Sequence, residues 1–244
     1  MELKGLKINF LGDSITEGVG ASCPENIYHA VLKREAELSE ARNYGISGTR
    51  IAVQHPTTKR EWSEIVDTHS FCERFHEMDD DADVVVVFGG TNDYGHGSAP
   101  IGSFSDRTPD TFYGACHYLF SGLIKKYIGK TIVIMTPLHR WGELSATKLP
   151  VTAPYYNLKG YVDIIREVAE YYSLPVLDLF KESGIQPEIP EIAEKYLPDG
   201  LHPSDDGHKV IADKLKNFLE KLWVNIVFKT INFFMWFFKT NIII

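Results

Sequence analysis

Short apolar runs alternate with longer amphipathic stretches along most of the chain. The run DVVVVFGG at 83–90 is continuous and β-branched, which is typical of a strand buried on both faces of a sheet. TIVIMTP at 131–137 repeats this pattern. With the weaker runs, the pattern predicts five strands: Leu6–Gly12, Arg42–Ile46, Asp83–Gly90, Thr131–Pro137 and Leu174–Leu179. Helical spacing of apolar positions predicts four helices: Ile27–Ser39, Thr111–Tyr127, Leu158–Tyr172 and Ser204–Trp223.

Strands and helices that alternate in this way indicate βαβ units, hence an α/β fold with a parallel sheet covered by helices on both faces. Ligands of such sheets bind outside the carboxyl ends of the strands, so we expect functional residues directly after each apolar run. No internal repeat and no long Pro/Gly/Ser-rich linker interrupts the pattern. It therefore predicts one domain over residues 1–223.

Residues 224–244 differ in composition from everything before them. They contain two lysines, no acid, no glycine and no proline, and they are rich in Phe, Ile and Asn. The longest uncharged stretch, Thr230–Phe238, has nine residues and is too short for a confident transmembrane span. We favour a packing or homo-oligomerisation helix, because association would cover an exposed apolar surface. A helix that contacts a membrane surface and an extension unrelated to function are the alternatives.

Composition narrows the class of protein. The chain has 244 residues, and its hydrophobic fraction of 44% suffices for a sizeable core. A formal charge of −8 and the absence of any basic run argue against a nucleic-acid partner. Three widely spaced cysteines fit neither a disulfide framework nor a zinc site, and the N-terminal segment lacks a long apolar stretch. We therefore expect a cytoplasmic enzyme.

Two motifs together contain the residues of a serine hydrolase triad. Ser14 follows the first predicted strand in the motif Gly12-Asp13-Ser14, where a nucleophile would lie at the edge of the sheet beside a helix N-terminus. A histidine must accept its proton, and a carboxylate must orient that histidine; His202 and Asp199 lie three residues apart and suit these roles. Taken singly, each motif is also consistent with a turn or a helix cap.

Two further motifs offer hydrogen-bond donors to an oxyanion. Gly48 belongs to the motif Gly45-Ile46-Ser47-Gly48 at the end of the second predicted strand. Asn92 belongs to the motif Gly90-Thr91-Asn92-Asp93 at the end of the third. Glycine allows close approach of the backbone, and the asparagine amide is a donor of the kind that stabilises a tetrahedral intermediate. A turn glycine and a polar loop turn are the alternative interpretations.

The four motifs, in this order, resemble those of the SGNH (GDSL-type) hydrolases: Gly12-Asp13-Ser14, Gly48, Gly90-x-Asn92-Asp93 and Asp199-x-x-His202. The resemblance covers about residues 6–222. It implies a flavodoxin-like three-layer α/β/α sandwich with a central parallel sheet of about five strands. It also implies Ser14 as nucleophile, His202 as base and Asp199 as the residue that orients it. The oxyanion hole would consist of the Ser14 and Gly48 N–H groups and the Asn92 side chain, with no metal or organic cofactor.

The substrate is less strongly indicated. The candidate substrate-binding residues are Asp13, Tyr94, His139 and Trp141. Aromatic side chains with polar neighbours suit sugar rings, so we expect a short O-acyl group, in particular acetyl, on a carbohydrate. His139 with Arg140 suits a substrate carboxylate or phosphate instead. A lipase or thioesterase for longer acyl chains is the alternative enzyme, and a non-catalytic binding module is the alternative outside the enzyme class.

Three other features have simpler interpretations. His208 is expected to cap or pack the last helix of the domain, and residues 79–81 form a solvated acidic loop rather than a metal site. Asp178 ends the last predicted strand and is a rival to Asp199 as the acid of the triad.

Overall fold

The computed structural model describes residues 3–54, 69–144 and 157–240, with side chains described as far as residue 222. Five parallel strands form one sheet in the order β2-β1-β3-β4-β5. The strands are β1 (Lys7–Gly12), β2 (Glu40–Gly45), β3 (Val84–Phe88), β4 (Thr131–Met135) and β5 (Val176–Leu177). The parallel sheet that the sequence predicts is confirmed.

Burial explains which strands the sequence predicts best. All five residues of the central strand β3 are buried, which is why its sequence is an uninterrupted apolar run. The edge strand β2 has no fully buried residue, and its sequence is correspondingly polar. The other edge strand, β5, has only two residues, so the predicted run Leu174–Leu179 is mostly loop and helix.

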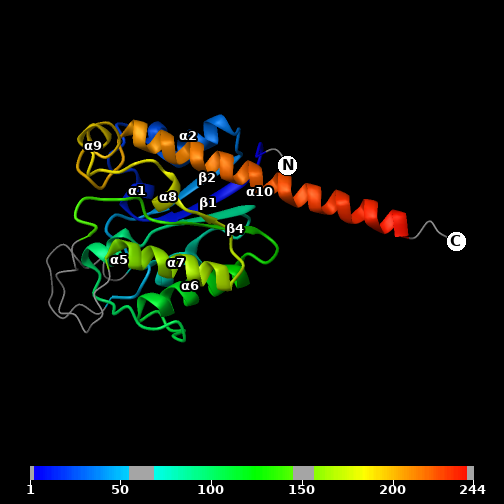
Figure 1. Ribbon diagram of the computed structural model, residues 1–244, viewed down its shortest axis with the longest axis horizontal. Helices are drawn as coiled ribbons and strands as arrows, with labels where there is room; N and C mark the ends of the chain where they lie inside the picture. Colours follow the sequence, from blue (N-terminus) through cyan, green and yellow to red (C-terminus); the bar gives the residue numbers. More distant parts are fainter. Residues whose placement is uncertain (1–2, 55–68, 145–156, 241–244) are drawn as a thin grey trace.

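Helices cover the sheet on two faces, which gives the α/β/α sandwich (Figure 1). One face carries α2 (Tyr28–Glu35) and α10 (Asp205–Thr240), and the other carries α6 (Phe112–Lys126) and α7 (Leu158–Tyr171). The shorter helices are α1 (Ser14–Glu17), α4 (Phe71–Arg74), α5 (Thr91–His96), α8 (Leu179–Glu182) and α9 (Pro190–Tyr196), with 3-10 turns at Pro24–Asn26 and Phe75–Glu77. Two apolar cores therefore lie on opposite faces of the sheet.

Two helix ends differ from the sequence prediction. Helix α2 ends at Glu35 rather than Ser39, because Glu37 adopts a left-handed φ of 50° that no α-helix accommodates. Helix α10 does not end at Trp223; its backbone continues to Thr240 and projects beyond the rest of the molecule (Figure 1). The predicted tail, residues 224–244, therefore begins within a helix, and its side chains lie outside the described residues.

Within the described part of the chain, no helix combines the length and the hydropathy that crossing a membrane requires.

Candidate active site

Ser14 is the first residue of α1, directly after the carboxyl end of β1. The Asp13 carboxylate caps this helix by accepting a hydrogen bond from the Ile15 N–H at 3.1 Å. Helix α1 turns back so sharply that a Cβ on Gly12 would lie 1.9 Å from Thr16 Oγ1. Only glycine fits there, and this tight turn presents Ser14 at the edge of the sheet with 6% of its surface exposed.

Ser14, His202 and Asp199 form a continuous hydrogen-bonded chain. Ser14 Oγ lies 3.0 Å from His202 Nε2, and His202 Nδ1 lies 2.6 Å from Asp199 Oδ2. The other carboxylate oxygen, Oδ1, accepts the backbone N–H groups of Leu201 and His202 at 2.9 and 2.6 Å. Burial alone would raise the pKa of Asp199, but these hydrogen bonds outweigh it and lower that pKa. Asp199 is therefore an ionised group that holds the imidazole in place.

Contacts on two sides hold the turn that carries Asp199 and His202. The backbone N–H of Trp141 donates to the Gly200 carbonyl at 2.9 Å. The backbone N–H and hydroxyl of Ser22 donate to the two carboxylate oxygens of Asp205, at 2.8 and 2.6 Å. The segment after β4 and the loop after α1 thus bring a turn from the end of the domain to Ser14.

The two other predicted oxyanion donors follow β2 and β3, the strands on either side of β1. Gly48, with a left-handed φ of 75°, belongs to the loop after β2, and Asn92 lies in the first turn of α5 after β3. The Asn92 amide donates to the Thr49 carbonyl at 3.1 Å and so joins the two segments. Because β1 lies between β2 and β3 in the sheet, Ser14, Gly48 and Asn92 come from three adjacent strands.

Buried charged groups support this edge of the sheet. Burial raises the pKa of Asp13 to about 7 and that of Asp93 to about 6. The Asp93 carboxylate accepts the backbone N–H groups of Ile51 and Ala52 at 2.9 and 3.0 Å. These hydrogen bonds fix the loop that contains Gly48 relative to α5.

Arg74 is a supporting residue that the sequence analysis missed. Its guanidinium donates to the Gly12 carbonyl at 2.6 Å and to Thr49 Oγ1 at 3.1 Å, so it links the ends of β1 and β2. Arg74 lies in the short helix α4 and is 4% exposed. A single arginine in a polar stretch gives no signal in the sequence, and only the fold brings it to the carboxyl end of β1, next to Ser14 in the chain.

Of the four candidate substrate-binding residues, three are buried or partly buried, and their side chains bind other residues of the protein. Asp13 is 2% exposed and caps α1, and the Tyr94 hydroxyl donates to the Gly142 carbonyl at 2.5 Å. The His139 ring contacts both carboxylate oxygens of Glu143, at 2.8 and 2.9 Å, and lies against the Phe180 ring. Trp141 differs from these three, because half of its surface is exposed.

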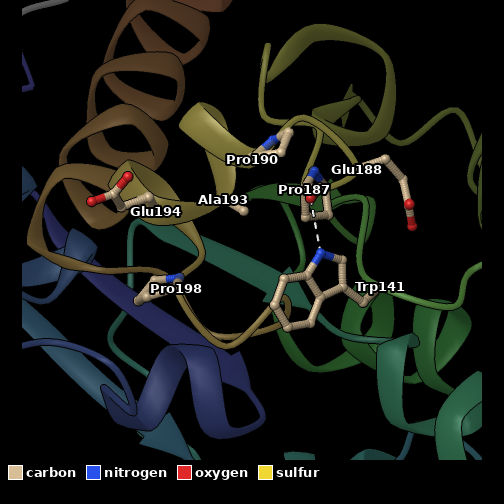
Figure 2. Close-up of a pocket in the computed structure, with 7 residues that line it drawn as sticks. All are labelled: Trp141, Pro187, Glu188, Pro190, Ala193, Glu194 and Pro198. Carbon is tan, nitrogen blue, oxygen red and sulfur yellow. Dashed lines mark hydrogen bonds between the residues drawn. The ribbon is translucent and has the colours of Figure 1, made fainter.

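Trp141 lines an open pocket of about 440 Å³ beside the Asp199–His202 turn (Figure 2). Its indole N–H donates to the Pro187 carbonyl at 2.8 Å, which fixes the ring. The remaining lining residues are Pro187, Glu188, Pro190, Ala193, Glu194 and Pro198. The pocket thus offers a fixed aromatic ring and proline rings to a ligand, and the carboxylates of Glu188 and Glu194 point outward on opposite sides of it (Figure 2).

The structure also gives the contacts of Asp178, His208 and the acidic loop at 79–81. The Asp178 carboxylate binds other groups than His202: it pairs with Arg166 at 2.8–2.9 Å, accepts a hydrogen bond from Thr136 at 3.0 Å and caps α8. His208 is buried and stacks on Tyr28. Asp81 of the acidic loop pairs with Lys7 and Arg42. Within the described ranges, no group of three or more His, Cys, Asp or Glu side chains is arranged to hold a metal.

A family model described as GDSL-like lipase/acylhydrolase matches residues 10–210. Among solved structures, one is 32% identical, with a TM-score of 0.75, and the match covers 91% of this chain and 99% of that one. A protein from Lactobacillus plantarum is 31% identical, with a TM-score of 0.73 and coverage of 89% and 98%. Comparison with curated proteins gives no significant match.

A more distant solved structure is that of an acetyl xylan esterase, AlAXEase. It is 22% identical, with a TM-score of 0.56, and the match covers 86% of this chain and 98% of that one. At this identity the likeness shows a shared fold. The resemblance that the four sequence motifs suggest is confirmed by the family match and by these folds together.

Proposed function

The chain belongs to the GDSL-like lipase/acylhydrolase family and is a carboxylic ester hydrolase, and we propose that it removes short O-acyl groups, chiefly acetyl, from carbohydrates. The nucleophile in this proposal is Ser14. The observation that supports it most directly is the hydrogen-bonded chain from Ser14 Oγ through His202 to Asp199, with contacts of 3.0 and 2.6 Å.

The proposed reaction has two steps. Ser14 Oγ attacks the ester carbonyl carbon while His202 Nε2 accepts the hydroxyl proton, and Asp199 stabilises the resulting imidazolium. The N–H groups of Ser14 and Gly48 and the Asn92 amide donate to the oxyanion. The intermediate expels the alcohol, which takes the proton from His202, and leaves Ser14 acylated. Water then attacks the acyl carbonyl carbon while His202 Nε2 accepts its proton. The bond from that carbon to Ser14 Oγ breaks, the acid leaves, and Oγ takes the proton back from His202.

The pocket beside Trp141 supports the carbohydrate part of the proposal. A half-exposed indole held by the Pro187 carbonyl is a flat apolar surface of the kind on which a sugar ring packs. Glu188 and Glu194 at the rim offer acceptors to sugar hydroxyl groups. The acetyl xylan esterase of the same fold supports the same class of substrate.

The test is hydrolysis of p-nitrophenyl acetate, butyrate and octanoate by the wild type and by Ser14→Ala. We expect turnover that falls sharply beyond about four carbons in the acyl chain, and a loss of roughly 10⁴-fold or more in Ser14→Ala. Ser39→Ala, an exposed serine ahead of β2, is the matched control and should retain wild-type rates.

Other outcomes point to the alternatives. A preference for octanoate would indicate a lipase or thioesterase. Turnover that does not depend on Ser14, or no turnover in folded protein, would favour a binding module. Acetylated xylo-oligosaccharides test the carbohydrate part separately: Trp141→Leu should lower kcat/KM for them much more than for p-nitrophenyl acetate.

A further inference from the structure

Asn92 and His96 lie one turn apart on α5 and therefore face the same side of the helix. His96 Nε2 lies 3.2 Å from Asn92 Oδ1. His96 belongs to none of the four sequence motifs, and the reaction proposed above does not use it. Its contact is with the side chain that would supply one of the three oxyanion donors.

An asparagine amide can present either its oxygen or its nitrogen to a ligand, and only the nitrogen stabilises an oxyanion. At Asn92, the amide nitrogen donates one hydrogen to the Thr49 carbonyl at 3.1 Å. The opposite atom, Oδ1, needs a donor if the amide is to stay in this orientation. His96 is that donor only when its Nε2 carries a hydrogen.

Arg50 determines which nitrogen of His96 carries the hydrogen. Its Nη1 lies 2.8 Å from His96 Nδ1. A guanidinium can only donate, so Nδ1 must accept, and a neutral imidazole then carries its hydrogen on Nε2. Arg50 is 3% exposed, His96 is partly buried, and the contact between them is itself partly buried.

The donors and acceptors form one directed chain: Arg50 to His96, His96 to Asn92, and Asn92 to Thr49. Because Thr49 and Arg50 are consecutive, the chain closes between α5 and the loop that contains Gly48. Among the described residues, Thr49 is the one acceptor that the Asn92 amide nitrogen contacts, so its second hydrogen can be donated to a ligand. We propose that His96 is a positioning residue, which holds the Asn92 amide in the orientation that donates to the oxyanion.

This inference rests on the proposed function, and a double-mutant cycle tests it. His96→Leu removes the donor, and we expect kcat for p-nitrophenyl acetate to fall about 10- to 100-fold, below or near the loss of a whole oxyanion donor. KM should change less than about threefold, because the interaction acts on the transition state. His96→Gln should recover most of kcat, since its amide can donate to Asn92 and accept from Arg50.

The cycle separates positioning from a general loss of structure. In an Asn92→Ala background, His96→Leu should cost less than about threefold, because the group that it orients is gone. An equal loss in both backgrounds, or an unchanged kcat in His96→Leu alone, would overturn the proposal. Circular dichroism and thermal unfolding of each variant report whether the fold is retained.

A second measurement does not depend on turnover. Long-range ¹H–¹⁵N correlation spectra of the full chain should show His96 with its hydrogen on Nε2, and the Asn92 side-chain amide signals should shift in His96→Leu. A hydrogen on Nδ1 would overturn the inference even in an active enzyme. Absence of Ser14-dependent turnover would instead contradict the proposed function, and the two failures are therefore distinguishable.

Discussion

Asp13 is the residue where burial and charge conflict most directly. Its carboxyl is 2% exposed, yet it precedes the proposed nucleophile and lies close enough to Asp93 for each charge to disfavour the other. Burial raises its pKa to about 7, although the hydrogen bond from Ile15 and the charge of Arg74 oppose this shift. A neutral Asp13 would spare the oxyanion a negative neighbour, which suits the chemistry proposed for Ser14.

The raised pKa predicts how stability depends on pH. The folded state binds the Asp13 proton more tightly than the unfolded chain does, so this stabilisation is complete below about pH 4 and is lost as pH rises toward 7. In Asp13→Asn the titrating group is absent. The free energy of unfolding of the wild type, relative to this variant, should therefore decrease between pH 4 and 7, by up to about 1.4 kcal/mol per pH unit.

Urea unfolding at several pH values measures this difference. Asp206→Asn, at an exposed position in the first turn of α10, shows what loss of a surface carboxylate does by itself. If the stability of the wild type relative to Asp13→Asn increased with pH over this interval, Asp13 would be ionised in the folded state, and the argument from burial would be wrong.

At the scale of elements, the segment between α9 and α10 is the one on which the proposed site depends most. It contains Asp199 and His202, and it turns at Gly200 with a left-handed φ of 74°. A Cβ on Gly200 would lie 2.1 Å from Cδ2 of Trp141. The Trp141 ring cannot retreat easily, because its N–H is bound to the Pro187 carbonyl.

Gly200→Ala should therefore displace the turn as well as strain it. We expect kcat for p-nitrophenyl acetate to fall at least tenfold, since a displacement of about 1 Å in a catalytic group can cost about 10²-fold. Gly184→Ala is the matched control, because Gly184 has a φ of 76° and no neighbour within 4 Å of a Cβ. Both variants should lose about 1–2 kcal/mol of stability from backbone strain, but only Gly200→Ala should lose activity. Wild-type kcat in Gly200→Ala would contradict this account.

The elements also show how far the sequence can predict this fold. β3 and β4 are predicted well because both faces of each strand are covered, so that nearly every residue is apolar. The helices α4, α8 and α9 have four to seven residues, too few for a helical period to appear, and no sequence pattern predicted them. In the candidate site, the sequence predicts Ser14, Gly48 and Asn92 because each follows a recognisable strand. The contact of Arg50 with His96 spans 46 positions and becomes visible only in the folded chain.

At the scale of the whole molecule, α10 joins two parts of different character. Leu215 and Leu219 are buried in the core beside α2, and Leu222 packs partly against it. Beyond that point the helix projects away from the sheet (Figure 1). The family match ends at residue 210, before this projecting part. The described residues of both cores and of the proposed site all lie at or before Leu222.

Truncation after Leu222 tests what the projecting part of α10 does. We expect the shortened protein to retain its unfolding midpoint and its rate on p-nitrophenyl acetate, because the described core and the triad candidates lie before residue 223. We also expect sedimentation equilibrium to give the shortened protein the mass of one protomer and the full chain a larger mass. The reason is that residues 224–244 are rich in Phe and Ile and contain only two charged residues, so that association would cover an apolar surface. Equal masses would contradict association through this segment. In that case, co-sedimentation of the full chain, but not of the truncated one, with anionic lipid vesicles would identify it as a helix that binds membrane surfaces.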